Sequence, residues 1–244
     1  MNNSWGLTLF GASLAVAIVI STVVVSRTML TIKQANQTVE VKGFAEKKIL
    51  SDWALWRGRF TARGTDLVET SNVLDGQKSI VLTFLGQAGI NQDELEVSPV
   101  TTQVLYRRDG KGRVTNTIEG YALHIDLTVS AGDIDRISKV AKESDVLIKQ
   151  GIQFSSQSPQ YFYTKLGNLK ISILGEATRD ARRRAEQLAE KSGSSIGSLR
   201  FARQGVFQIT PVYSTEVSNF GRNDTSSREK SIKAVVTIGY ALAN

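Results

Sequence analysis

An uninterrupted apolar stretch near the N-terminus limits what this chain can fold into more than any other feature. Residues 5–26, WGLTLFGASLAVAIVISTVVVS, contain no charged side chain. A helix of about 20 apolar residues crosses the hydrocarbon core of a bilayer. We therefore predict a transmembrane helix at residues 5–26 that anchors the chain to a membrane. A buried core helix is the weaker alternative, because core helices rarely stay apolar on all sides over such a length.

A cleaved secretory signal is the other alternative, and the residues around the stretch argue against it. Such signals have a basic segment, an apolar region of about 7–15 residues and a cleavage site with small residues. Here no Lys or Arg precedes the stretch, and VVVS before Arg27 is a poor cleavage site. We expect an uncleaved anchor and short spacer at residues 1–36, followed by one α+β domain at residues 37–244.

The charges beside the anchor leave its orientation open. Arg27 and Lys33 follow the apolar stretch, so the positive-inside rule by itself places the domain in the cytoplasm. Long domains can nevertheless be exported whatever their charge, and the rule constrains this topology weakly.

The remainder of the chain has the pattern of an α+β fold. Alternating apolar and polar residues predict strands at 37–45 and 51–62, with a turn at 46–50. Asp66 and Asp133 are predicted helix N-caps, and RRDGKGR predicts a hairpin turn. Further strands are predicted at 94–106, 118–130, 152–163, 195–209 and 231–242. The order ββαββαβαββ predicts a mostly antiparallel sheet packed with three helices.

Two predicted helices have a core-facing stripe. In the first, the stripe recurs every seven residues with apolar flanks: Leu67, Leu74, Val81 and Ala88, beside Val73, Ile80 and Phe84. In the third, ending at Gly193, the stripe is narrow and made mainly of small residues: Ala177, Ala181, Ala185, Leu188 and Ala189. Acidic neighbours offset Arg182, Arg183 and Arg184, so we interpret these arginines as the solvent side of a packed helix.

Composition excludes several kinds of chemistry. The chain has no cysteine, which excludes disulfides, thiolate metal sites and cysteine nucleophiles. It has one histidine, which excludes most histidine-dependent metal chemistry. The net charge of +7 is spread thinly, and residues 66–96 carry −5. A concentrated basic patch would be needed to indicate a polyanion partner. We expect no cofactor and no nucleic-acid partner.

Several segments, in this order, resemble the SIMPL-domain family. They are VEVKGFAEKKILSDWALW, GYALHIDLTVSAGDIDRI, GIQF, EATRDARRRAEQLAEKSGSSIGSL and AVVTIGYAL, which together cover about residues 37–243. The resemblance implies an α+β domain outside the cytoplasm, assembly into higher oligomers and a link to stress tolerance. It implies no established catalytic mechanism and supplies no catalytic residues. Many members have a cleaved signal, whereas this chain has a longer apolar helix.

One pair of residues is a weak candidate for catalysis. His124 and Asp126 are two apart in a predicted strand and share its polar face. They could act as a base and the group that orients it. A reactive site would also need a nucleophile or metal beside them, and the chain has no motif that supplies one. We favour a solvated or helix-covered histidine.

A second candidate surface is basic. Arg57, Arg59 and Arg63 share the polar face of the predicted strand at 51–62. They could line an oligomer interface or contact an anion or acidic lipid head groups. The alternative that we favour is neutralisation by acids of the helix that follows, within residues 66–96.

Together, these patterns predict a non-enzymatic, single-pass protein of the bacterial inner membrane. The resemblance to the SIMPL-domain family implies that its domain lies in the periplasm, assembles with copies of itself and supports tolerance of envelope or oxidative stress. Two alternatives stay open. One is an envelope hydrolase or chaperone-like enzyme using His124 and Asp126. The other is a binder of anionic lipid or nucleic acid.

Overall fold

The computed structural model describes residues 4–35, 37–216 and 218–243, and it is an α+β structure with two mostly antiparallel sheets. The chain divides into two compact units. We call residues 1–46, 169–207 and 233–244 the anchor-bearing unit, and residues 47–168 and 208–232 the hairpin unit. The sequence predicted one sheet and one domain at residues 37–244. The structure has two sheets instead of the one predicted, and the domain boundary stays a prediction.

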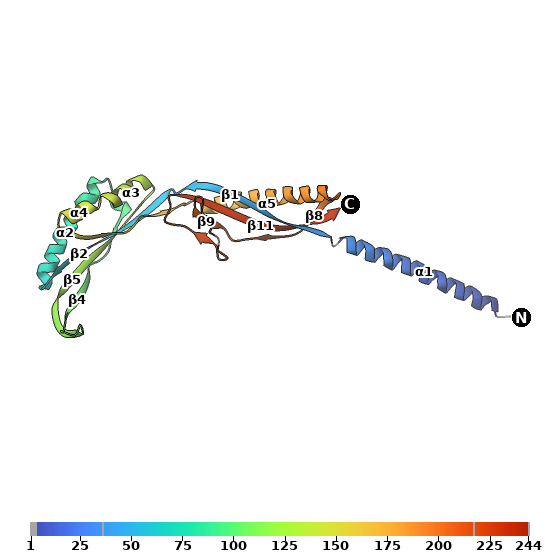
Figure 1. Cartoon of the computed structure of the whole chain (residues 1–244), viewed down its shortest axis with the longest axis horizontal. Coiled ribbons are helices and arrows are strands. Elements are labelled where there is room, and N and C mark those ends of the chain that lie inside the picture. The colour runs from blue at the N-terminus through green and yellow to red at the C-terminus, as the bar shows by residue number, and fades with distance from the viewer. Residues whose placement is uncertain (1–3, 36, 217, 244) are drawn as a thin grey trace. The chain divides into compact units, whose positions relative to one another are not determined.

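The first helix, α1 (Ser4–Ala35), contains the predicted anchor (Figure 1). Its segment Phe10–Met29 is long and apolar enough to cross a membrane, and none of that segment is buried. The alternative of a buried core helix is therefore wrong. The structure also differs from the predicted spacer, because α1 continues to Ala35. Residue 36 lies outside the described residues.

The first sheet has the strand order β1-β11-β9-β10, with β8 also paired to β11. Its strands are β1 (Thr38–Leu50), β8 (Ser195–Gln204), β9 (Gln208–Pro211), β10 (Arg222–Asn223) and β11 (Glu229–Ala243). The predicted turn at 46–50 is wrong, because β1 runs straight through it. Ile49 is buried like Val41 and Ala45, whose alternate positions in β1 it shares, and the Ser51 amide donates to the Arg228 carbonyl at 2.9 Å.

In the anchor-bearing unit, α5 (Leu166–Lys191) packs closely on β1 (Figure 1). The predicted small-residue stripe is confirmed for four buried alanines, namely Ala177, Ala181, Ala185 and Ala189. Leu188 was wrongly included, since it is exposed. Gly43 makes the close approach possible: a Cβ there would lie 2.1 Å from the Ala177 carbonyl oxygen.

The second sheet lies in the hairpin unit and has the order β3-β5-β2-β6, with β4 paired to β5 and β7 to β2. Its strands are β2 (Trp53–Gly64), β3 (Leu95–Val97), β4 (Thr101–Arg108), β5 (Val114–Ala131), β6 (Gln153–Ser156) and β7 (Gln160–Phe162). Three predicted strands are each split. Pro99 separates β3 from β4 and Pro159 separates β6 from β7, since proline cannot donate to a ladder. Residues 205–207 separate β8 from β9.

Helices α2 (Leu67–Gln87), α3 (Ile134–Glu143) and α4 (Asp145–Lys149) belong to this unit, together with the short 3-10 helix η1 (Gln92–Glu94). The predicted caps are confirmed: Asp66 accepts from the Glu69 amide and Asp133 from the Arg136 amide, both at 2.9 Å. The predicted stripe of α2 is partly wrong. Leu74 and Val81 are buried, whereas Leu67, Val73 and Ile80 are exposed.

The core of the hairpin unit fills the space between these helices and one face of the sheet. It includes Trp56 and Phe60 of β2, Leu127 of β5, Leu85 of α2 and Ile137 of α3. Every second residue is buried from Ala54 to Ala62 of β2 and from Leu123 to Ala131 of β5, as the alternation predicted. The alternate residues of both strands therefore lie on the opposite face, which we call the open sheet face.

Candidate functional site

The open sheet face brings both predicted sites together. Antiparallel pairing of β2 with β5 places Arg57 opposite Thr128, Arg59 opposite Asp126, Thr61 opposite His124 and Arg63 opposite Ala122. Because side chains alternate, the three arginines, His124 and Asp126 all lie on the same face. The hairpin of β4 and β5 that holds this register was predicted from its turn.

Arg59 and Asp126 form a two-pronged ion pair on this face. Arg59 Nε lies 2.7 Å from Asp126 Oδ1, and Nη2 lies 3.0 Å from Oδ2. The hydrogen bond from Arg59 is the largest cause that lowers the pKa of Asp126, with smaller contributions from the charges of Arg59 and His124. The same contact raises the pKa of Arg59. Both oxygens of Asp126 are thus directed at Arg59.

This pairing changes both sequence interpretations. Arg59 is neutralised by Asp126 of β5, so the expectation that acids of the following helix neutralise it is wrong for this residue. The carboxylate of Asp126 is hydrogen-bonded to Arg59 and does not orient His124. In the part of the chain that the structure describes, no hydrogen bond joins the His124 ring to another residue. His124 is half-buried, and its cross-strand neighbours are Thr61 of β2 and Thr101 of β4.

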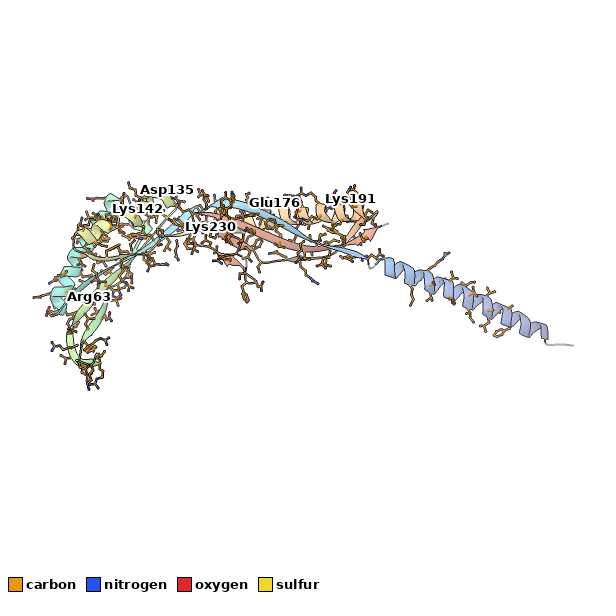
Figure 2. All side chains as sticks on the ribbon, in the orientation of Figure 1. Arg63, Asp135, Lys142, Glu176, Lys191 and Lys230 are labelled. Atoms are coloured by element: carbon orange, nitrogen blue, oxygen red, sulfur yellow. The ribbon has the colours of Figure 1, made fainter. Side chains whose placement is uncertain are left out.

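The other two arginines are oriented differently. Arg57 donates from Nη1 to Gln160 Oε1 at 3.1 Å, which links β2 to β7. Arg63 is exposed at the end of β2 and has no acidic partner within the described residues (Figure 2). Among the same residues, no group of three or more His, Asp or Glu side chains is arranged to hold a metal ion.

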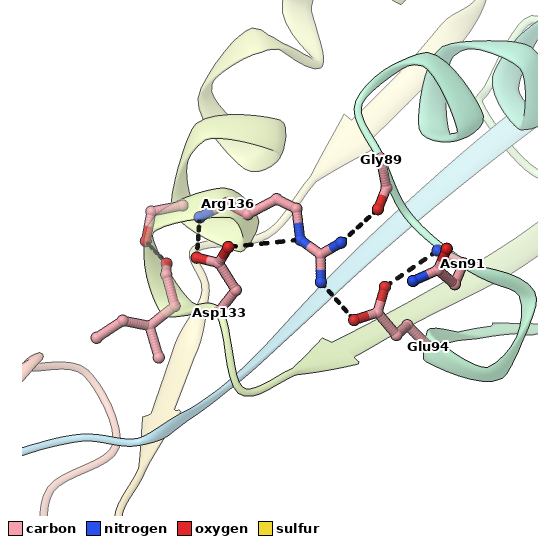
Figure 3. Close-up of polar contacts among 7 residues, drawn as sticks. Gly89, Asn91, Glu94, Asp133 and Arg136 are labelled. Carbon is pink, nitrogen blue, oxygen red and sulfur yellow. Dashed lines mark hydrogen bonds and ion pairs between the residues drawn. The ribbon is translucent and has the colours of Figure 1, made fainter.

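A second polar cluster in the hairpin unit joins the start of α3 to the segment between α2 and β3 (Figure 3). Arg136 of α3 donates to the Gly89 carbonyl and pairs with Glu94 of η1, while Asp133 lies 3.9 Å from its Nε. Glu94 in turn accepts from the Asn91 amide at 3.0 Å. The side chains of Arg136 and Glu94 are largely buried, so the cluster holds the α2–β3 connection against the start of α3.

A buried lysine was not predicted. Lys230 of β11 is 2% exposed, and its Nζ donates to the Tyr161 carbonyl at 2.6 Å and to the Asp224 carbonyl (Figure 2). Burial lowers the pKa of this ammonium. The sequence pattern indicates this burial, because Lys230 lies on the same strand face as the buried Ile232, Ala234 and Val236. Within the described residues, both hydrogen bonds of Nζ go to backbone carbonyls, and the bond to Asp224 holds residues 222–226 in place.

The arginine run of α5 is paired internally. Asp180 accepts from the Phe44 amide at 2.9 Å and from Arg184 Nε at 2.8 Å, and Arg183 lies 3.7 Å from it. Arg182 pairs with Glu186 at 2.8 Å. The hydrogen bond from Phe44 is the largest cause that lowers the pKa of Asp180. Grooves of about 550 and 830 Å³ flank Asp180, and both are lined by these mutually paired charges.

A family model described as SIMPL, a protein of unknown function (DUF541), matches residues 39–240. The chain belongs to the SIMPL family. No curated protein matches the chain.

Two solved structures show distant likeness. One is the de novo designed protein Foldit4, 13% identical, with a TM-score of 0.23, covering 43% of this chain and 93% of its own. The other is an uncharacterized conserved protein from Listeria innocua, 11% identical, with a TM-score of 0.18, covering 79% of this chain and 92% of its own.

Proposed function

We propose that this SIMPL-family protein is held in the bacterial inner membrane by α1 and acts by assembling with copies of itself, without catalysing a reaction. The observation that carries the proposal is the exposed apolar segment Phe10–Met29. Its mean hydropathy is 1.9 and none of it is buried. A helix of this length and character is stable in a bilayer and insoluble in water.

The open sheet face supports a role in binding over one in catalysis. A general base needs a reactive partner within hydrogen-bond reach, and an orienting group that is free to hold it. Each carboxylate oxygen of Asp126 instead accepts from Arg59, and within the described residues no hydrogen bond joins Asp126 to the His124 ring. Exposed apolar side chains on the hairpin and on α2, described below, are typical of surfaces that other proteins cover.

We place the soluble domain in the periplasm and connect the assembly with tolerance of envelope or oxidative stress. This placement rests on the resemblance described above, and the charges beside α1 leave it to experiment. Accessibility of an engineered cysteine at Lys165, an exposed residue, to a membrane-impermeant maleimide tests it. Labelling in intact spheroplasts supports the periplasm, and labelling only after lysis contradicts it.

Direct imaging of full-length particles in mild detergent tests the assembly. We expect particles of uniform size and rotational symmetry that contain several copies. A particle with the mass of one chain plus its detergent, at micromolar concentration, contradicts the proposal. Intact mass of the purified chain decides between an anchor and a cleaved signal, since cleavage removes the apolar residues.

Two other functions have their own outcomes in these experiments. A hydrolase using His124 requires turnover that is lost in His124→Ala while the fold is retained. A binder of anionic lipid or nucleic acid, using Arg57 and Arg63, requires affinity that falls steeply with salt. Either result replaces self-assembly as the primary role.

A further inference from the structure

The end of the β4–β5 hairpin is an exposed arm that carries apolar side chains. We call residues 106–118 the hairpin arm. Gly120 is buried, whereas no residue of the arm is, and Tyr106, Val114 and Ile118 are 46%, 59% and 50% exposed. The arm forms one end of the hairpin labelled β4 and β5 in Figure 1.

The arm is well ordered by its own hydrogen bonds. Asp109 accepts from the amides of Lys111 and Arg113, both at 2.9 Å, and Thr115 Oγ1 donates to the Arg107 carbonyl at 2.8 Å. The register places Tyr106 opposite Ile118. An isolated hairpin is only marginally stable in water. An arm that holds its shape by these bonds and exposes the apolar pair Tyr106–Ile118 to water is suited to pack against a partner.

The charge of the arm is strongly positive. The arm contains four basic residues and one acid, Asp109, so its net charge is +3. The basic residues are Arg107, Arg108, Lys111 and Arg113. Arg113 is paired with Asp109 at 2.8 Å, and Arg108 donates to the Gly112 carbonyl at 2.9 Å. Arg107 and Lys111 are exposed and have no acidic partner within the described residues. A partner for the arm should be acidic and partly apolar.

The outer face of α2 has this complementary character. We use this name for Val68, Glu69, Val73, Asp75 and Ile80, of which Val68, Val73 and Ile80 are 67%, 53% and 41% exposed. A surface helix normally presents polar residues to water. Glu69 and Asp75 are exposed, without a cationic partner in the described ranges, and residues 66–96 as a whole carry −5.

We infer that the hairpin arm of one copy lies on the outer face of α2 of a second copy. The inference rests on the proposed self-assembly and names its interface. Apolar residues on both surfaces would be removed from water, and Arg107 and Lys111 would meet Glu69 and Asp75. Each copy offers one arm and one helix face, so the contact is head-to-tail. Such a contact closes into a ring or continues as a filament.

Cross-linking tests the contact directly, because the chain has no cysteine of its own. Full-length Ile118→Cys and Val73→Cys chains, with tags of different size, are co-expressed and treated with a short bis-maleimide. We expect a covalent heterodimer from the mixture and none from either variant alone. In the control, a Lys139→Cys chain, changed on the exposed side of α3, is used in place of the Val73→Cys chain. This mixture should give no covalent heterodimer. Absence of the heterodimer in an assembled sample overturns the inference.

A charge exchange supplies a second readout. Arg107→Glu with Lys111→Glu should raise the concentration of half-association by about tenfold or more, and so should Glu69→Lys with Asp75→Lys. All four changes together should restore most of the affinity. Lys139→Glu with Lys142→Glu, which reverses the same number of charges on α3, should have little effect.

The outcomes separate the two proposals. If the full-length protein assembles and all charge variants assemble equally well, the interface is wrong and self-assembly stands. If the unmodified protein is monomeric, both proposals fail.

Discussion

Arg59 and Asp126 face each other across β2 and β5, and the two nitrogen–oxygen contacts of 2.7 and 3.0 Å take up both carboxylate oxygens. The pair occupies the centre of the surface where sequence analysis placed its two candidate sites. It neutralises the central arginine of a basic triplet and engages the carboxylate that could have oriented His124. The open sheet face thus holds less free charge than the sequence suggests.

The pair predicts an acid-sensitive contribution to stability. The pKa of Asp126 is lower in the folded chain than in the unfolded chain, because Arg59 donates to its charged form. The contribution is therefore present at neutral pH and is lost as the pH falls through the folded pKa. The Arg59 and Asp126 side chains are 51% and 45% exposed, so solvent screens the pair and its contribution to stability should be small.

Carboxyl carbon shifts in a pH titration measure this pKa directly. We expect the Asp126 midpoint below that of an ordinary aspartate, and a rise toward the ordinary value in Arg59→Gln. Asp145, which is paired with Lys149 elsewhere in the unit, is the internal control and should not move. An Asp126 midpoint that is the same in both proteins contradicts the account.

Lys230 is predicted to hold residues 222–226 in place. Replacement by Met keeps much of the volume but leaves the Tyr161 and Asp224 carbonyls without their donor. We expect a loss of about 1–3 kcal/mol in unfolding free energy and faster hydrogen exchange in residues 222–226. Denaturant unfolding and hydrogen exchange of the full chain in detergent measure both.

The same lysine predicts an alkaline effect. Burial lowers its folded pKa, so the unfolded chain holds more protons between the folded and the ordinary pKa. Stability relative to Lys230→Met should therefore rise with pH over that range. A constant or falling difference contradicts the assignment of Lys230 as a buried ammonium.

Gly43 is predicted to be irreplaceable for packing α5. A Cβ there would lie 2.1 Å from the Ala177 carbonyl oxygen and 2.6 Å from the Ala181 Cβ, and a helix backbone cannot move aside locally. Gly43→Ala should cost about 1–3 kcal/mol. Gly175→Ala is the matched control, since its added Cβ would meet no atom within 4 Å beyond the adjacent backbone of its own helix, and alanine favours helix. It should stabilise by about 0.5–1 kcal/mol in thermal unfolding.

Val19 lies in the middle of the apolar segment and provides a test of the anchor. A lysine at the centre of a transmembrane helix costs about 3 kcal/mol on insertion scales. Val19→Lys should therefore shift chain from the carbonate-resistant membrane fraction into the supernatant or to degradation. Val19→Leu should remain in the membrane. Equal retention of both variants would show that α1 is not the anchor.

The elements that sequence analysis predicted correctly are those with one-sided burial. Alternation in β2 and β5 and the alanine stripe of α5 each follow from a local period that the structure preserves. In α2 the same method failed, because apolar Val73 and Ile80 are exposed and Thr70 is buried in their stead. Periodicity cannot distinguish a core stripe from an apolar surface that another molecule covers.

What the sequence could not reveal depends on contacts between distant segments. The Arg59–Asp126 pair requires the register of β2 against β5, with α2, β3 and β4 between them in the chain. The division into two sheets likewise depends on long-range pairing of β1 with β11. The charged residues 46–50 resembled a turn, yet pairing with β11 carries β1 through them.

Co-isolation of two differently tagged full-length copies from one membrane preparation tests the central claim most directly. The copies are expressed together, membranes are washed with carbonate and dissolved in mild detergent, and one tag is captured. The account predicts that the second copy is recovered with the first, and that both come from the membrane fraction. Recovery of the captured copy alone, or of both from the soluble fraction, would contradict it.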